Sequence, residues 1–159
     1  MKKRWLFIAS LVVALHQLAR ITVFPTVAEH GGPIEVLPFF NLVEVWNHGI
    51  SFGMFSNLAY GQWLLSGLSA TIIVAFLIWL RKVDNTFTAI ALCLVIGGAL
   101  GNLIDRLWFG AVVDYLDFHA FGYHWPAFNL TDAAIFLGAV LLLLSTKEAV
   151  KEMTKTRMK

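Results

Sequence analysis

Four of the ten acidic residues fall within one stretch of the sequence that is otherwise largely apolar: Asp105, Asp114, Asp117 and Asp132. Two aspartates brought together at a boundary of low dielectric cannot both ionise easily, so one keeps its proton and the other becomes a base. One carboxylate can then deprotonate a water held between them while the other donates to a carbonyl oxygen. That is the chemistry of an aspartyl peptidase.

Other hydrolytic routes fit the sequence less well. Cys93 lies in an apolar run, where its thiolate would be desolvated and a poor nucleophile. His119 and His124 lie five apart without a metal-ligand pattern around them. No Gly-rich phosphate loop follows a strand, and no serine has an obvious base.

Two helix ends could present these acids. Gly98, Asn102 and Asp105 are spaced i, i+4 and i+7, so they share one face of a helix, and Gly98 lets another backbone come close. Further on, Asn129 or Thr131 could cap the next helix, with Asp132 in its first turn. Both patterns have a simpler explanation. The first could be only a small-residue packing face with a solvated helix end, and the second could be only a helix cap.

The composition is that of a membrane protein. The chain has 159 residues, 58% hydrophobic and 14% charged, with a mean hydropathy of +0.73. A spanning helix needs about 20 largely apolar residues. The segments that supply them are residues 5–24, 58–80, 87–107 and 131–145, and together they predict one domain over residues 1–159. The first segment could be a cleaved signal, but no clear cleavage site follows it, so we expect a retained helix.

Basic residues set the predicted orientation. Of the 12, all but Arg20 and Arg106 precede the first segment, separate the second from the third, or follow the fourth. The positive-inside rule then places both termini in the cytoplasm.

Two long segments lie on the extracytoplasmic side. Residues 36–46 are rich in strand formers, a turn signal follows at 47–49, and residues 51–55 could return as a second strand. Residues 108–130 carry many aromatic side chains, which suit the headgroup layer. The predicted fold class is an all-α membrane protein with four transmembrane helices, a small extracytoplasmic β-sheet or hairpin, and a loop or short helix near the outer leaflet.

Three blocks of the sequence resemble signatures of the bacterial lipoprotein signal peptidases, the signal peptidase II family. They are residues 47–53, residues 97–106 running on through 110–115, and residues 128–132. The length, the four spans and the predicted orientation agree, so the resemblance covers essentially the whole chain.

The resemblance implies an endopeptidase that cleaves the signal peptide from diacylglyceryl-modified prolipoproteins just before the lipidated cysteine. The family's catalytic dyad maps onto Asp114 and Asp132. The positions that match its substrate-site residues are Asn47, Asn102, Asp105, Arg106 and Asn129.

The resemblance further implies that no metal or cofactor is needed and that the antibiotic globomycin binds at the substrate site. We expect prolipoproteins and membrane lipid as partners, no nucleic acid, and a monomer. The expected location is the bacterial cytoplasmic (inner) membrane, with the active site at the extracytoplasmic face.

The chain departs from the family at a few positions. His16 stands where an aspartate is usual, although Gln17 and the basic Arg20 are kept. Histidine titrates near neutrality, so this change could alter the local packing or the response to pH. Thr131 and Tyr115 stand where alanine and phenylalanine are usual, and both changes look conservative.

Two other functions stay open on the residues alone. Membrane carboxylates often relay protons, as in a proton-coupled transporter, but transporters tend to have internal repeats and acids near mid-membrane. A noncatalytic membrane scaffold could use the same polar blocks only to cap helices and anchor loops.

Overall fold

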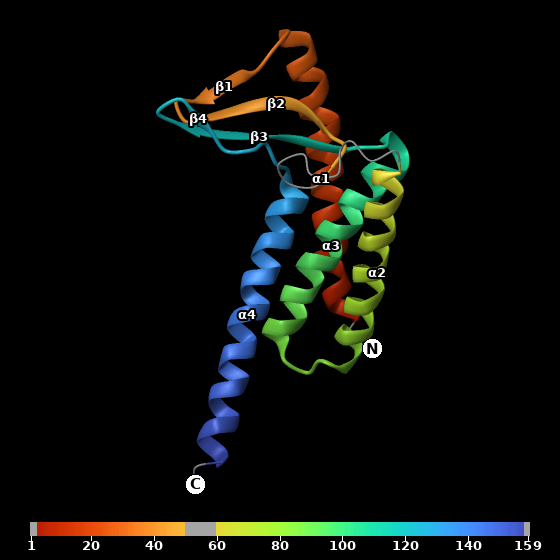
Figure 1. Ribbon diagram of the computed structural model, residues 1–159, viewed down its shortest axis with the longest axis vertical. Coiled ribbons are helices and arrows are strands. Elements are labelled where there is room, and N and C mark those ends of the chain that lie inside the picture. Colours follow the sequence, from red (N-terminus) through yellow and green to blue (C-terminus); the bar gives the residue numbers. More distant parts are fainter. Residues whose placement is uncertain (1–2, 50–59, 158–159) are drawn as a thin grey trace.

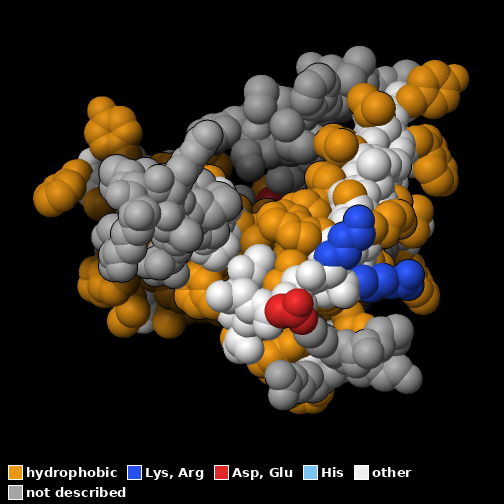
Figure 2. All heavy atoms as spheres, turned by 90° about the horizontal axis from the view of Figure 1, so that it is seen from below, with side chains coloured by type: hydrophobic (Ala, Val, Ile, Leu, Met, Phe, Trp, Pro, Cys, Tyr) orange, Lys and Arg blue, Asp and Glu red, His pale blue; other side chains and the backbone are white. Residues whose placement is uncertain are grey.

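The computed structural model describes residues 3–49 and 60–157. Its four long helices are each apolar and long enough to cross a membrane: α1 (Lys3–His30), α2 (Gly61–Lys82), α3 (Thr86–Phe109) and α4 (Leu130–Arg157). Both ends of the chain lie at one end of the helix bundle, and a small sheet lies at the other (Figure 1). Basic side chains are visible among hydrophobic ones at the end opposite the sheet (Figure 2). The fold class predicted from the sequence is confirmed.

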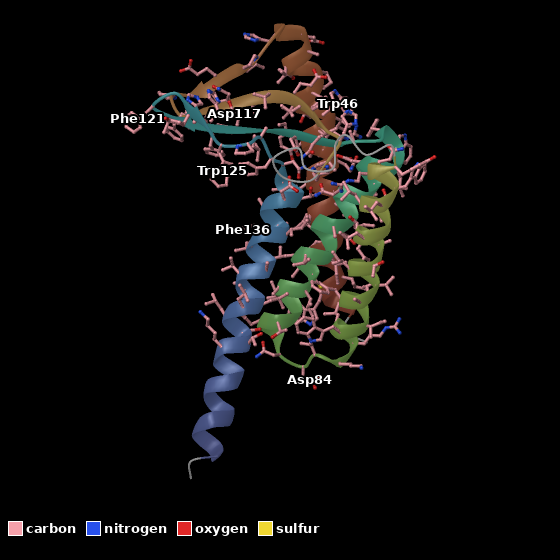
Figure 3. The ribbon with its side chains drawn as sticks, viewed as in Figure 1. Trp46, Asp84, Asp117, Phe121, Trp125 and Phe136 are labelled. Atoms are coloured by element: carbon pink, nitrogen blue, oxygen red, sulfur yellow. The ribbon has the colours of Figure 1, made fainter. Side chains whose placement is uncertain are left out.

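Helix α3 is the centre of the bundle. In its most apolar stretch 61% of residues are buried, against 17% in the corresponding stretch of each other helix. The outer helices therefore present apolar side chains outward, as Phe136 does on α4 with 72% of its surface exposed (Figure 3). Such surfaces suit lipid, because the bilayer core solvates apolar side chains. The backbone N–H and C=O groups, which lipid cannot bond, are paired within each helix.

Two helices run past the ends expected from the sequence. The first was expected to stop at residue 24, before Pro25, but α1 continues through Pro25 to His30. Prolines are tolerated within membrane helices. Near Pro25 the hydroxyls of Thr22 and Thr26 donate to the carbonyls of Leu18 and Thr22, which are not the Ile21 carbonyl that the missing N–H of Pro25 would have reached. Helix α4 was expected to end at residue 145, yet it continues to Arg157 through a tail rich in helix-forming Glu, Lys and Met.

The sheet has four antiparallel strands in the order β1-β2-β3-β4. Strands β1 (Ile34–Leu37) and β2 (Phe40–Asn47) form a hairpin, β3 (Val112–Ala120) pairs along β2, and β4 (Tyr123–His124) returns along the end of β3. Segments far apart in the sequence are thus brought side by side above the ends of α3 and α4 (Figure 1).

The strand details differ from the sequence interpretation. Residues 36–46 were expected as one strand, but the chain turns at Pro38 and Phe39, because proline fixes φ for a turn and has no N–H to give to a ladder. The expected return strand at 51–55 lies outside the described residues. The principal partner of β2 is instead β3, from a segment in which no strand was expected.

Two glycines on α3 let α4 approach closely. A Cβ on Gly98 would overlap the backbone carbonyl of Thr131 and the side chain of Ile135, and one on Gly101 would overlap the Thr131 methyl group. The close packing face predicted for this part of α3 is therefore confirmed. It holds the first turn of α4 against the last turns of α3, which is where the polar residues of both helices gather.

Candidate active site

Asp114 and Asp132 line one cavity of about 310 Å³. Asp114 comes from the middle of the sheet, on β3, and Asp132 from the first turn of α4. The other walls come from α2, α3, β2, the segment between β4 and α4, and further residues of β3 and α4. The residues that form them are Asn47, Ser69, Asn102, Arg106, Val112, Trp125, Pro126, Ala127, Phe128 and Ile135. Residues far apart in the chain thus converge on the pair of acids.

The Asp114 carboxylate is buried, with 1% of its surface exposed, and both of its oxygens accept hydrogen bonds. Asn47 Nδ2 donates to Oδ2 at 2.9 Å, and Asn129 Nδ2 donates to Oδ1 at 2.7 Å. Asn47 pairs with Val112 in the β2–β3 ladder. Since alternate residues of a strand share a face, this register carries the Asn47 side chain diagonally to Asp114.

The Asp132 carboxylate is held by two different donors. Asn102 Nδ2 on α3 donates to Oδ1 at 2.8 Å, and the backbone N–H of Asn129 donates to Oδ2 at 3.2 Å. Asn129 therefore contacts both acids, one through its side chain and the other through its backbone.

Asn129 is also the N-cap of α4. Its Oδ1 accepts from the backbone N–H groups of Thr131 (2.8 Å) and Asp132 (3.1 Å), and from the Thr131 hydroxyl. The same hydroxyl lies 2.5 Å from Asn102 Oδ1. The cap expected from the sequence is thus real, and it belongs to the network that holds the two acids.

The electrostatics of the cavity favour one retained proton. Burial, and next the charge of Asp132, raise the pKa of Asp114 to about 7, against the hydrogen bonds from Asn47 and Asn129 and the charge of Arg106, which lower it. Arg106 lines the cavity and donates to the Gly49 carbonyl at 3.1 Å. Near neutral pH the site can therefore hold an acid and a base together.

Asp105 does not line this cavity. It is fully buried, and its oxygens face α1 and β3: His16 Nε2 lies 3.0 Å from Oδ2, Gln17 Nε2 donates to Oδ1, and the Val113 N–H donates to Oδ2. Of the positions expected at the substrate site, Asn47, Asn102 and Arg106 line the cavity, Asn129 supports both acids, and Asp105 lies behind the wall.

Several wall residues were not foreseen from the sequence. Trp125 lies beneath the sheet, near the start of α4 (Figure 3), and the residues that follow it to Phe128 complete that wall. The sequence analysis did not place these residues at the site, because it interpreted their segment as an aromatic loop at the membrane interface. Phe128 pairs with Leu116 of β3, which draws the segment over the cavity.

The described residues contain no group of three or more His, Cys, Asp and Glu side chains that could hold a metal ion. His124 and Asp117 do form a close pair, with His124 Nδ1 at 2.9 Å from both carboxylate oxygens. Asp117 lies further out along the sheet (Figure 3) and does not line the cavity.

Four helices long enough to span a membrane, a sheet at one end, and a cavity lined by a buried Asp114 and a half-buried Asp132 define a polytopic membrane protein with a candidate active site at the sheet end of its bundle. The sequence model of the family described as signal peptidase (SPase) II matches residues 8–147. The chain therefore belongs to the signal peptidase II family and is a membrane protease that removes lipoprotein signal peptides.

Curated relatives and solved structures agree with this membership. The lipoprotein signal peptidases of Burkholderia thailandensis and Burkholderia multivorans are 41% and 42% identical to this chain over 150 residues, covering 92% of it and 89% of each relative. Two structures described as bacterial membrane enzymes superpose with TM-scores of 0.80 and 0.76, at 28% and 29% identity. The first alignment covers 96% of this chain and 92% of the other, and the second covers 92% and 94%.

Proposed function

We propose that this protein is an aspartyl endopeptidase that cleaves diacylglyceryl-modified prolipoproteins immediately before the lipidated cysteine, with Asp114 and Asp132 as the catalytic pair. The observation that carries the proposal is the pair itself: two carboxyl groups line one cavity and share Asn129 as a hydrogen-bond donor.

The proposed reaction uses one proton held between the two acids. Because the pKa of Asp114 is raised to about 7 by burial and by the charge of Asp132, Asp114 is the favoured site of that proton at neutral pH. Asp132 then takes a proton from a water molecule, whose oxygen attacks the scissile carbonyl carbon, while Asp114 gives its proton to the carbonyl oxygen. As the tetrahedral intermediate collapses, the C–N bond breaks and the proton gained by Asp132 passes to the departing amine. One hydroxyl on the former carbonyl carbon returns a proton to Asp114, which restores the starting protonation of the pair.

The neighbouring polar groups hold both carboxyl groups in place. The amide donors of Asn47 and Asn129 fix the Asp114 carboxyl, and Asn102 fixes Asp132. Arg106 adds a positive charge to the cavity wall. Such a charge stabilises the negative charge that develops on the carbonyl oxygen during attack.

The depth of the site suits a lipidated substrate. Asn102 lies near the sheet end of α3, and Asp132 lies in the first turn of α4. The positive-inside rule assigns that end of the bundle to the extracytoplasmic side and both termini to the cytoplasm. A substrate whose acyl chains stay in the outer leaflet would present its peptide bond at this level. Globomycin, which the family resemblance assigns to the substrate site, would bind at the same level. We expect the enzyme to act as a monomer and without a cofactor.

The test is cleavage by the purified protein in lipid or mild detergent. A prolipoprotein carrying the diacylglyceryl group is compared with the same chain before lipid transfer, and the new termini are identified by mass spectrometry. We expect a new N-terminus at the lipidated cysteine and little cleavage of the unmodified chain. Equal cleavage of both chains would contradict the proposed substrate class, and an intact modified chain would contradict the proposed activity.

A further inference from the structure

His16 is a fully buried polar side chain that the reaction described above does not use. It lies on α1, has 0% exposure, and is not among the residues that line the cavity. Its Nε2 atom lies 3.0 Å from Asp105 Oδ2. A buried polar group in a membrane helix is costly unless its partners make it useful.

The Asp105 oxygen that contacts His16 also holds the strand of Asp114. Asp105 Oδ2 accepts the backbone N–H of Val113 at 3.3 Å, and Val113 is the residue immediately before Asp114. Asp105 Oδ2 contacts both His16 Nε2 and the backbone N–H of Val113. The imidazole therefore holds this oxygen in the position from which it binds β3.

His16 also contacts the residue on the other side of Asp114. Its ring stacks on Tyr115, with ring centroids 6.0 Å apart and planes at 26°. The Tyr115 hydroxyl in turn accepts the backbone N–H of Leu130 at 3.3 Å, where α4 begins. Both flanks of Asp114 are thus supported by one side chain, and the second support reaches the helix that carries Asp132.

The His16 ring is placed to donate from Nε2, because its contact there is with a carboxylate oxygen. The charged and titratable groups that face it are Asp105 on α3, Arg20 on its own helix and Tyr115 on β3. Arg20 Nε, at 3.9 Å from Asp105 Oδ1, already offers this carboxylate a positive charge. Nδ1 of His16 is buried without a hydrogen-bond partner among the described residues, so Nε2 carries the hydrogen bond of this ring.

We propose that His16 is a positioning residue for the reaction: through the shared oxygen of Asp105 and through Tyr115 it fixes the segment of β3 that places Asp114 opposite Asp132. The inference rests on the catalytic role proposed above for Asp114. Its test therefore includes one measurement that does not depend on activity.

The test compares His16→Leu, His16→Gln and His16→Asn with a matched control, Thr22→Val, on the exposed part of the same helix, where the hydroxyl contacts only its own helix. A glutamine amide can stand where Nε2 stands, whereas an asparagine amide falls at the place of Nδ1 and cannot reach Asp105. We expect His16→Leu and His16→Asn to lose roughly tenfold or more in kcat with KM nearly unchanged, because small misplacements of reacting groups lower the rate strongly. His16→Gln and Thr22→Val should stay within about threefold of wild type, since one keeps the donor and the other leaves the site untouched.

The second measurement is amide hydrogen exchange of a peptide that contains Val113, followed by mass spectrometry. Exchange there should be faster in His16→Leu and His16→Asn than in wild type, and unchanged in His16→Gln and Thr22→Val. Unchanged exchange in folded His16→Leu would overturn the inference whatever the protein cleaves. If that variant does not fold, equal kcat and equal exchange in His16→Gln and His16→Asn would overturn it instead. A wild type without cleavage but with the expected exchange pattern would contradict only the proposed function.

Discussion

Replacing Asn129 by alanine perturbs the candidate site at its most connected residue. The change removes the 2.7 Å bond from Nδ2 to Asp114, and it removes the Oδ1 acceptor that caps α4 through the N–H groups of Thr131 and Asp132. The backbone N–H of residue 129, which donates to Asp132, remains. One substitution therefore weakens the hold on one acid and the start of the helix that carries the other.

The expected loss of stability follows from these bonds. Losing an N-cap side chain costs about 0.5–2 kcal/mol, and losing a hydrogen bond to a charged group costs about 1.5–3 kcal/mol. The second figure applies only while Asp114 is ionised, so we expect a total of about 2–5 kcal/mol at mildly alkaline pH. In a chain of this size that corresponds to a fall in Tm of roughly 4–20 °C.

The expected change in activity has a definite sign. Because the Asn129 bond lowers the pKa of Asp114, its removal raises that pKa. The alkaline limb of the pH–rate profile, where the pair loses its one proton, then moves to higher pH. The assay is kcat against pH on a lipidated substrate, together with thermal unfolding in the same detergent.

Two variants separate the two roles of Asn129. Asn129→Ser keeps a capping oxygen but cannot reach Asp114, so it should restore the capping part of the lost stability and none of the shift in the limb. Asn41→Ala removes a comparable bond, from Asn41 Nδ2 to Asp117 at 2.9 Å, outside the cavity. It should leave the pH profile unchanged. An Asn129→Ala protein with the wild-type limb and Tm would refute the reasoning.

Further expectations concern the charge and the packing of the site. Asp132→Asn should lower the pKa of Asp114, since the charge of Asp132 is one of the causes that raise it; infrared titration of the carboxyl band would detect this, and an unchanged pKa would show that the acids do not interact. Asn47→Ala should raise the same pKa, because it removes a bond that lowers it. A carboxyl whose pKa is raised from 3.8 to about 7 on folding stabilises the protein at low pH and loses that contribution as the pH rises through 7. Asp114→Asn should thus exceed the wild-type Tm at about pH 8, with the gap closing toward about pH 4, and a constant gap would contradict the shift. Gly98→Val should cost about 2 kcal/mol or more and separate α4 from α3, whereas Gly67→Val, at a position with open space, should change Tm little.

The helices and the cap could be predicted because their signals are local. Apolar runs of sufficient length predict spans, the i, i+4, i+7 spacing places Gly98 and Asn102 on one face, and an asparagine three residues before Asp132 predicts a cap. Helix ends were less predictable. Pro25 is a strong stop signal in water, yet α1 passes through it, and local propensity alone does not include the membrane environment, in which prolines are tolerated within helices.

The sheet and the position of Asp105 depend on contacts between distant segments. Strand β3 pairs with β2 across more than sixty intervening residues, as the Asn47↔Val112 pair shows, and no local pattern encodes such a register. Asp105 shares a helical face with Asn102, so the spacing predicted that Asp105 would line the cavity as well. The structure instead turns its carboxylate toward His16 and Gln17 on α1, and only the packing of α1 against α3 decides that.

The claim that Asp114 and Asp132 act together is tested most directly by the single-turnover rate of cleavage in Asp114→Asn and Asp132→Asn, measured beside Asp117→Asn. The third variant changes an acid of the same strand that lies outside the cavity, bonded to Asn41 and His124. We expect each of the first two variants to lose roughly a thousandfold or more, as when an essential acid or base is removed. Asp117→Asn should stay within about tenfold of wild type. Cleavage by folded Asp114→Asn or Asp132→Asn at close to the wild-type rate would contradict the account.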